Sequence, residues 1–150
     1  FLSAEHFPDY VMYVENLEDL LSQADFLTLH MPLSRKTHHL IDSDRIAQMK
    51  EGAILVNTAR GGLVDEKALV RALERGHLAG VGLDVFEHEP PEVDNPLFSV
   101  DRRRLILTPH SAGLTDRSME RMAEMVCGGM LSVLNGEHPS NVANPEVWGI

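Results

Sequence analysis

Short apolar runs, several of them β-branched, punctuate the chain and have the character of strands buried in a parallel sheet. They are residues 26–30, 53–56, 80–86 and 105–108, with 11–14 as a further candidate strand. Segments with apolar residues at helical spacing lie between them. The expected helix starts are polar residues that can cap a first turn, namely Asn16, Asp42 or Ser43, and Asp65. Strands that alternate with helices predict an α/β fold whose parallel sheet is covered on both faces.

A longer amphipathic segment follows the last expected strand. Apolar residues, several methionines among them, recur at helical spacing from Met119 to Leu134, which predicts a helix of about five turns. We expect this stripe, including Cys127, to lie in a core. Residues 87–99 are rich in proline and acid and predict a long loop, and residues 137–150 predict an extended tail.

Composition narrows the class of protein. With 150 residues, 43% hydrophobic and 24% charged, the chain is expected to form a globular domain with a real core. The net charge of −10 argues against a nucleic-acid surface, which needs clustered Lys and Arg. A single cysteine rules out an internal disulfide and fits a reducing compartment. No apolar run approaches the roughly 20 residues that span a bilayer, so a soluble, cytoplasmic protein without a membrane partner is expected.

Residues 53–65 contain the clearest change of character in the chain. An apolar run stops at Asn57 and Thr58, and an arginine and two glycines follow before Asp65. This predicts a strand, a tight loop and a helix, with Arg60 just past the carboxyl end of the strand, where open α/β sheets bind their ligands. The alternative is a surface arginine in an ordinary loop, and this stretch alone does not separate the two interpretations.

Ionisable residues follow two more of the expected strands. Glu89 comes after the run at 80–86 and His110 after the run at 105–108, while Asp84 lies near the end of its strand. In a parallel sheet these ends share one edge with Arg60. Arginine can bind a carboxylate with two hydrogen bonds, and a histidine supported by a carboxylate can transfer a proton. The set therefore suits chemistry at an alcohol or carbonyl beside a carboxylate.

Other reaction classes find less support in the sequence. There is no Gly-x-Ser-x-Gly elbow for a serine hydrolase and no His-Glu-x-x-His spacing for a zinc protease. His38 and His39 are adjacent, so they cannot face one way on a strand. We expect no metal site.

Four ordered motifs resemble the signatures of the D-isomer-specific 2-hydroxyacid dehydrogenases, and their spacing matches as well. They are Leu29 to Leu33, Val56 to Gly62, Gly82 to Phe86 with Glu89-Pro90, and Thr108 to His110. The tail, with Gly136 to Pro139 and Asn141 to Pro145, is similar to the family's segment that crosses back to its substrate domain. The resemblance thus covers the C-terminal part of an NAD-binding domain and the crossover tail.

The resemblance implies an NAD- or NADP-dependent dehydrogenase that interconverts a small D-2-hydroxy acid and its 2-oxo acid. Arg60 would bind the substrate carboxylate and carbonyl, His110 would be the general acid and base, and Glu89 would hydrogen-bond the histidine. A carboxylate beside an imidazole favours the protonated form, which can donate to a 2-oxo acid near neutral pH. The implied cofactor-binding residues are Met31, Thr58, Ala59, Arg60, Asp84, His110, Ala112 and Gly113.

The resemblance also implies what this chain does not supply. The family's Gly-x-Gly-x-x-Gly phosphate turn and the acidic residue that follows it are not among these residues. Phe1 is not a methionine, and we expect the chain to be a piece of a longer protein. Residues 1–135 would be a partial Rossmann-like, doubly wound domain without its phosphate-binding portion, and 136–150 a tail that packs on an absent substrate domain. We expect the isolated chain to be inactive and the full-length protein to be a homodimer.

A different class of function stays open beside the enzyme. Transcriptional corepressors keep the same fold, so the chain could belong to a binding module that senses a dinucleotide without catalysis. These corepressors retain the Arg, Glu and His set, which therefore does not separate the two. The glycine fingerprint expected ahead of Phe1 in an enzyme would do so.

Overall fold

The computed structural model describes residues 7–148 and divides the chain into two compact units. The first is Phe1–His110 and the second is Ser111–Ile150. This division concerns packing within the chain, and the expected boundary between residues 135 and 136 stays a prediction. The two units are described separately.

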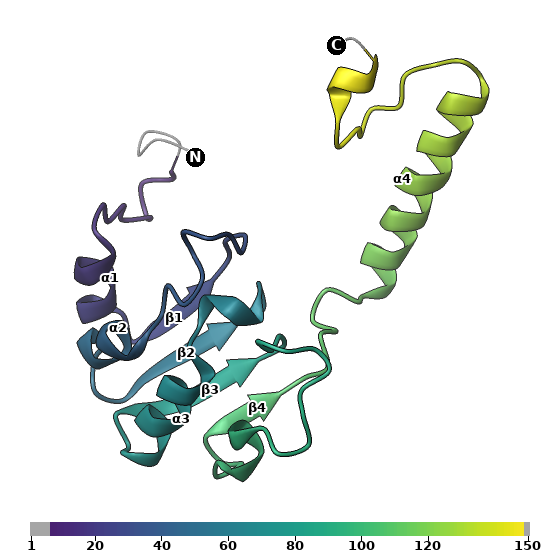
Figure 1. The fold of residues 1–150 in the computed structure, drawn as a ribbon. Helices are drawn as coiled ribbons and strands as arrows, with labels where there is room; N and C mark the ends of the chain where they lie inside the picture. Colours follow the sequence, from purple (N-terminus) through teal and green to yellow (C-terminus); the bar gives the residue numbers. More distant parts are fainter. Residues whose placement is uncertain (1–6, 149–150) are drawn as a thin grey trace. The chain divides into compact units, whose positions relative to one another are not determined.

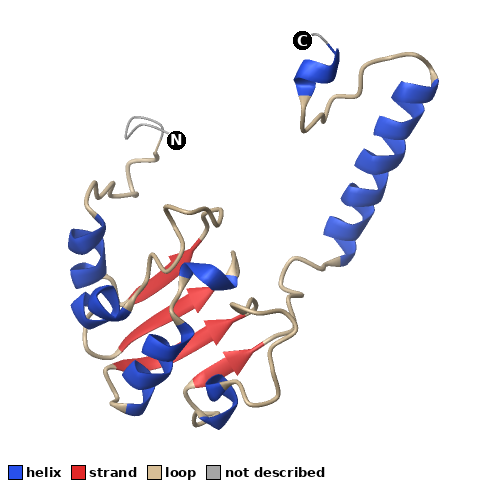
Figure 2. Ribbon diagram, in the orientation of Figure 1, coloured by secondary structure: helices blue, strands red, loops and turns tan. Residues whose placement is uncertain are grey.

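The first unit is built on a four-stranded, wholly parallel sheet (Figure 1). Its strands are adjacent in chain order, namely β1 (Phe26–Leu29), β2 (Ala53–Asn57), β3 (Leu78–Leu83) and β4 (Leu105–Leu107). The helices are α1 (Leu17–Gln23), α2 (Ser43–Gln48) and α3 (Glu66–Glu74). They pack on one face of the sheet, as Figure 2 shows. The predicted Rossmann-like α/β fold is confirmed, but within this unit the described helices cover one face of the sheet and not both faces as predicted.

Side chains alternate between the two faces of the sheet. Leu27, Leu55 and Val81 point into the core under the helices and are buried. On the opposite face Phe26 and Ile106 are 72% and 71% exposed, so the described residues of this unit leave that face open. The burial of one face explains why the strands are set in one register, because a slip by one residue would expose the core side chains.

Local sequence determines where the central helices begin. Asp42 accepts hydrogen bonds from the amides of Asp44 and Arg45, and Asp65 accepts one from Ala68 at 2.9 Å, so both predicted caps are confirmed. Asn16 precedes α1 as predicted, but its side chain makes no capping hydrogen bond. Gly76, two residues beyond α3, has a φ of +75°, the left-handed conformation that ends many helices.

Some predicted elements differ from the structure. Residues 11–14 form no strand; Met12 is 76% exposed and no described strand lies beside it, so its apolar character alone does not order it. Strand β3 starts and ends earlier than the predicted 80–86, because its pairing with β4 stops at Leu83. The predicted loop 87–99 contains a 3-10 helix at Pro96–Ser99, whose first amide is capped by Asn95.

The second unit contains α4 (Asp116–Leu134), which Thr115 and Ser118 cap reciprocally. No residue of α4 is buried within this unit, and Met119 and Cys127 are exposed, so the expectation of a core position is wrong here. A single helix and a short return segment have too little chain to cover the apolar stripe of a 19-residue helix. The chain returns past the helix and forms an open apolar groove of about 690 Å³ that includes Pro139 and Asn141.

The predicted extended tail contains a 3-10 helix at Pro145–Trp148, and its last two residues lie outside the described part. Within residues 7–148 no helix combines the length and the apolar character needed to cross a membrane.

Candidate active site

The three residues predicted to do chemistry come after neighbouring parallel strands. Arg60 follows β2, Glu89 follows β3 and His110 follows β4. The carboxyl ends of parallel neighbours lie at the same edge of the sheet, so the structure places all three loops there. Their placement agrees with the sequence analysis, and their roles stay predictions.

Glu89 and His110 form a direct pair. Nδ1 of His110 lies 2.7 Å from Oε2 of Glu89, although the two residues are 21 positions apart. The other oxygen of Glu89 accepts a hydrogen bond from the amide of Phe86 at 3.0 Å, which orients the carboxylate. The pair occupies Nδ1 of the imidazole, so Nε2 is the nitrogen that can exchange a proton with a ligand.

Hydrogen bonding holds the pKa of Glu89 below its usual value of 4.5. The largest cause is the hydrogen bond from His110, followed by the one from the Phe86 amide. Burial acts in the opposite direction, and the positive charges of His110 and Arg60 add to the lowering. Glu89 is therefore ionised at neutral pH and can stabilise an imidazolium.

The backbone at His110 adds a feature that the hydrophobic pattern does not reveal. Its φ is +52°, in the left-handed region that non-glycine residues rarely adopt. The preceding segment is fixed by β4, and the amide of His110 donates to the carbonyl of Thr108 at 3.0 Å. Residues in such conformations cluster at functional sites, where the surrounding structure maintains them.

Asn57 organises the turn that carries Arg60. Its side chain is fully buried, accepts a hydrogen bond from the Ala59 amide at 3.0 Å and donates one to the Arg60 carbonyl at 2.9 Å. The Arg60 side chain is exposed, and its Nη1 donates to the Ala59 carbonyl. A rigid turn with an exposed guanidinium suits the binding of an anion from solvent.

Gly61 brings this turn against the loop before Glu89. A Cβ atom at Gly61 would lie 1.9 Å from the carbonyl carbon and oxygen of Phe86. These are backbone atoms and cannot move aside as a flexible side chain would. Glycine is therefore required where the two loops touch.

We expect Gly61→Ala to destabilise the protein by about 1–3 kcal/mol or more, because the added methyl group overpacks two backbone segments. The measurement is the free energy of unfolding of the parent chain in denaturant. Here the parent chain is the longest natural polypeptide that contains these residues. Gly82→Ala is the matched control, since its Cβ would meet Val56 at an ordinary 3.8 Å. Equal stability of the two variants would contradict the close approach at Gly61.

The predicted cofactor-binding residues fall into two groups. Asp84 is buried and accepts a hydrogen bond from Thr108 at 2.5 Å, while its amide donates to the Asn57 carbonyl. The others of the first unit lie around the same sheet edge, with Met31 and Ala59 half-buried and Thr58 exposed. Ala112 and Gly113 belong to the second unit, so their part in a site stays a prediction.

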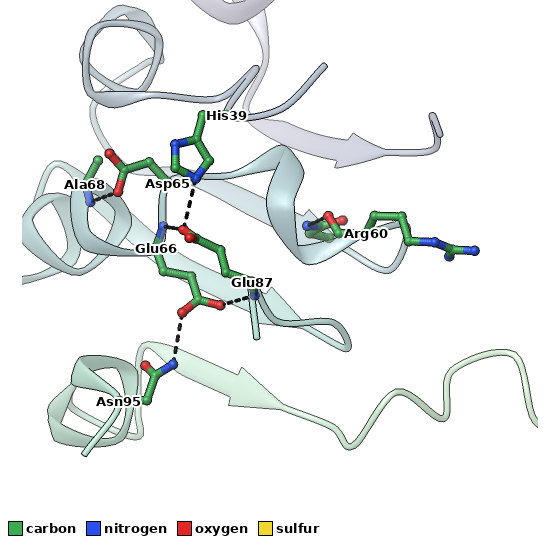
Figure 3. A network of polar contacts seen from close by, with 8 residues as sticks. His39, Arg60, Asp65, Glu66, Ala68, Glu87 and Asn95 are labelled. Carbon is green, nitrogen blue, oxygen red and sulfur yellow. Dashed lines mark hydrogen bonds and ion pairs between the residues drawn. The ribbon is translucent and has the colours of Figure 1, made fainter. Parts of the chain in front are cut away.

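A pair of carboxylates, Glu66 and Glu87, joins the start of α3 to the loop after β3 and is not evident from the sequence. Glu66 begins α3 and Glu87 lies in the loop before Glu89, and each accepts a hydrogen bond from the backbone amide of the other (Figure 3). A glutamate in the first turn of a helix is too common to signal such a contact. Among residues 7–148 no group of three or more His, Cys, Asp or Glu side chains could hold a metal ion.

The candidate site of the first unit lies within a segment that matches a known protein family. Residues 2–112 match the family described as D-isomer specific 2-hydroxyacid dehydrogenase, NAD binding domain. A glyoxylate reductase of Korarchaeum cryptofilum is 47% identical over 131 residues, which cover 87% of this chain and 39% of that protein. A D-3-phosphoglycerate dehydrogenase of Methanocaldococcus jannaschii is 46% identical over 89% of this chain and 25% of its own length.

Solved structures share the fold. The structure of D-lactate dehydrogenase from Aquifex aeolicus, complexed with NAD and lactic acid, is 37% identical and matches with a TM-score of 0.76. The match covers 84% of this chain and 41% of that one. The chain therefore spans about 40% of the length of most of the relatives it matches.

Proposed function

The chain belongs to the D-isomer-specific 2-hydroxyacid dehydrogenase family, and from this premise we propose that it carries the catalytic residues of an NAD-dependent enzyme that interconverts a D-2-hydroxy acid and its 2-oxo acid. The hydrogen bond of 2.7 Å between His110 and Glu89 carries the proposal. It supports an imidazole on the sheet edge that also bears Arg60. These are the groups that a carbonyl beside a carboxylate requires.

In the proposed reaction each side chain has a separate role. Arg60 binds the substrate carboxylate through its guanidinium, which can form two parallel hydrogen bonds. In the direction of reduction, Nε2 of His110 donates a proton to the carbonyl oxygen, and it takes the proton back in oxidation. Glu89 keeps the imidazole oriented and stabilises its protonated form.

The residues present fit the nicotinamide end of a dinucleotide. Thr58 is exposed just after the carboxyl end of β2. At the same sheet edge, the buried Asp84 accepts a hydrogen bond from Thr108, which joins the ends of β3 and β4. Bound NAD or NADH would accept or supply the hydride. We propose that Met31, Thr58, Ala59, Arg60, Asp84 and His110 hold this end, with Ala112 and Gly113 from the second unit. NAD is favoured by the family and by the complexed D-lactate dehydrogenase, and NADP is the alternative.

The test is reduction of small 2-oxo acids by the parent chain. Glyoxylate and pyruvate are mixed with NADH or NADPH, and cofactor oxidation and the configuration of the product are followed. If the protein is the proposed enzyme, we expect turnover and, from pyruvate, the D-2-hydroxy acid as product. Dinucleotide binding without turnover of any 2-oxo acid would favour the non-catalytic, corepressor-like module instead.

We propose further that residues 1–150 alone bind NADH weakly and are inactive. The Gly-x-Gly-x-x-Gly turn, whose amides and helix dipole hold a pyrophosphate, is not among them. Calorimetric titration of the isolated chain with NADH tests this. We propose in addition that residues 1–135 form a partial NAD-binding domain, that residues 136–150 form a tail that packs on a substrate domain, and that the parent chain is a homodimer.

Glu89→Gln should change the pH dependence of the parent chain. The pKa of Glu89 is held below 4.5, so the unmodified carboxylate keeps its charge across about pH 5 to 8. This charge is lost only as the pH falls below 4.5. Glutamine removes the charge that stabilises the imidazolium. We expect the alkaline limb of kcat/KM for reduction to move to lower pH. A profile that coincides with that of the unmodified protein would contradict the role of Glu89.

A further inference from the structure

We propose that Glu66 and Glu87 are positioning residues, which fix the loop of Glu89 beside the turn that follows β2. The inference deepens the function proposed above, because it concerns how the same site is held together. Neither residue lies among those expected to touch substrate or cofactor. The argument rests on their contacts, their burial and their place between the two catalytic loops.

The contacts form a closed pair. The Glu66 amide donates to Oε1 of Glu87 at 2.8 Å, and the Glu87 amide donates to Oε1 of Glu66 at 2.7 Å. Asn95 donates to the second oxygen of Glu66 at 2.9 Å, and Nε2 of His39 lies 3.3 Å from Oε1 of Glu87 (Figure 3). Two segments 21 residues apart are thereby joined by two hydrogen bonds, each from the backbone amide of one glutamate to the side chain of the other.

The cost of this arrangement argues against an incidental contact. Glu66 is only 7% exposed, and a buried carboxylate is unfavourable unless it is hydrogen-bonded. A second carboxylate nearby adds repulsion, which the amides and the N-terminal end of α3 offset. The helix does not need the pair for its cap, because Asp65 already accepts from the Ala68 amide.

The pair acts on the peptide between Phe86 and Glu87. On one side the Glu87 amide is held by Glu66, and on the other the Phe86 amide donates to Glu89. The same peptide packs directly against Gly61. A displacement of this peptide would therefore shift the carboxylate that supports the catalytic histidine. It would also loosen the contact with the turn of Arg60, whose side chain extends away from Glu66 and Glu87 in Figure 3.

The experiment compares three variants in the parent chain. Glu66→Gln puts an amide donor against either the Glu87 amide or Asn95, so one hydrogen bond is lost whichever way it turns. Glu87→Ala removes the acceptor of the Glu66 amide, whereas Glu87→Gln keeps an oxygen there. The matched control is Glu74→Gln, which removes a charge from the exposed end of the same helix.

We expect Glu66→Gln and Glu87→Ala to lower kcat by about tenfold to a hundredfold, as misplacement of catalytic groups by ~1 Å does. The dissociation constant of NADH should stay within about twofold, and Glu87→Gln should keep more than about half of the activity. Nitrogen resonances of the His110 imidazole report its bond to Glu89 independently of turnover. They should move in the two impaired variants and stay in place in Glu74→Gln.

A purely structural role would give lower melting temperatures but unchanged kcat and unchanged His110 resonances in the folded variants, and this would overturn the proposal. It would also be overturned if Glu87→Gln were as impaired as Glu87→Ala, because charge and not the acceptor would then matter. Absence of reductase activity in the unmodified parent chain would refute the proposed function alone. The resonances would still decide whether the pair positions Glu89.

Discussion

Replacing His110 by glutamine in the parent chain should lower kcat for reduction of a 2-oxo acid by about 10²- to 10⁴-fold, the range that general acid catalysis contributes. Glutamine has a similar reach but no group that titrates near neutral pH. The Phe86 amide still donates to Glu89 in this variant, so the loop of Glu89 should keep its position. The measurement is the rate of NADH oxidation at saturating substrate across a pH series.

Binding of NADH separates proton transfer from a general collapse of the site. We expect its dissociation constant to change by less than about threefold, since the imidazole is not the main anchor of the cofactor. His88→Gln is a matched control, because His88 is an exposed histidine in the loop next to Glu89. Retention of most of the activity by His110→Gln would exclude the imidazole as the proton donor.

The architecture of the first unit follows from local pattern. Short apolar runs, a cap at Asp42 and another at Asp65 are sufficient to predict parallel strands with helices between them. The shared sheet edge of Arg60, Glu89 and His110, the residues proposed to be catalytic, follows from that topology alone. The sequence is therefore sufficient to place Arg60 and His110 at one edge of the sheet.

Features that depend on distant contacts could not be predicted in this way. Gly61 resembles any loop glycine until the backbone of Phe86 is found against it. Glu66 has the character of an ordinary first-turn glutamate, and only the approach of a segment 21 residues away reveals its hydrogen bonds. The left-handed conformation of His110 likewise arises from the surrounding chain, because histidine has no intrinsic need for it.

The apolar pattern of a segment also predicts more burial than the structure shows where no second surface packs on that segment. Residues 11–14 have strand-like composition but no described strand beside them, and Met12 is exposed. The stripe of α4 has the spacing of a core helix, yet none of its residues is buried within the second unit. Periodicity predicts which face of an element is apolar, whereas burial requires a second surface.

Arg60→Ala in the parent chain should lower kcat/KM for 2-oxo acids by about ten- to a hundredfold, because loss of one charge-assisted contact is worth about 1.5–3 kcal/mol. The buried side chain of Asn57 holds the backbone of the turn through the Ala59 amide and the Arg60 carbonyl. Truncating the arginine side chain leaves those bonds in place. The loss should therefore report recognition of the carboxylate and not collapse of the loop.

Two further variants make the Arg60 prediction specific. Arg60→Lys keeps the charge but not the planar fork, so it should recover only part of the loss. Arg71→Ala removes an exposed arginine from α3 and should leave kcat/KM unchanged. A substrate amide in place of the carboxylate gives a further check: the unmodified protein should discriminate strongly against it, and Arg60→Ala should discriminate little. Equal preference for the carboxylate in both proteins would show that another group binds it.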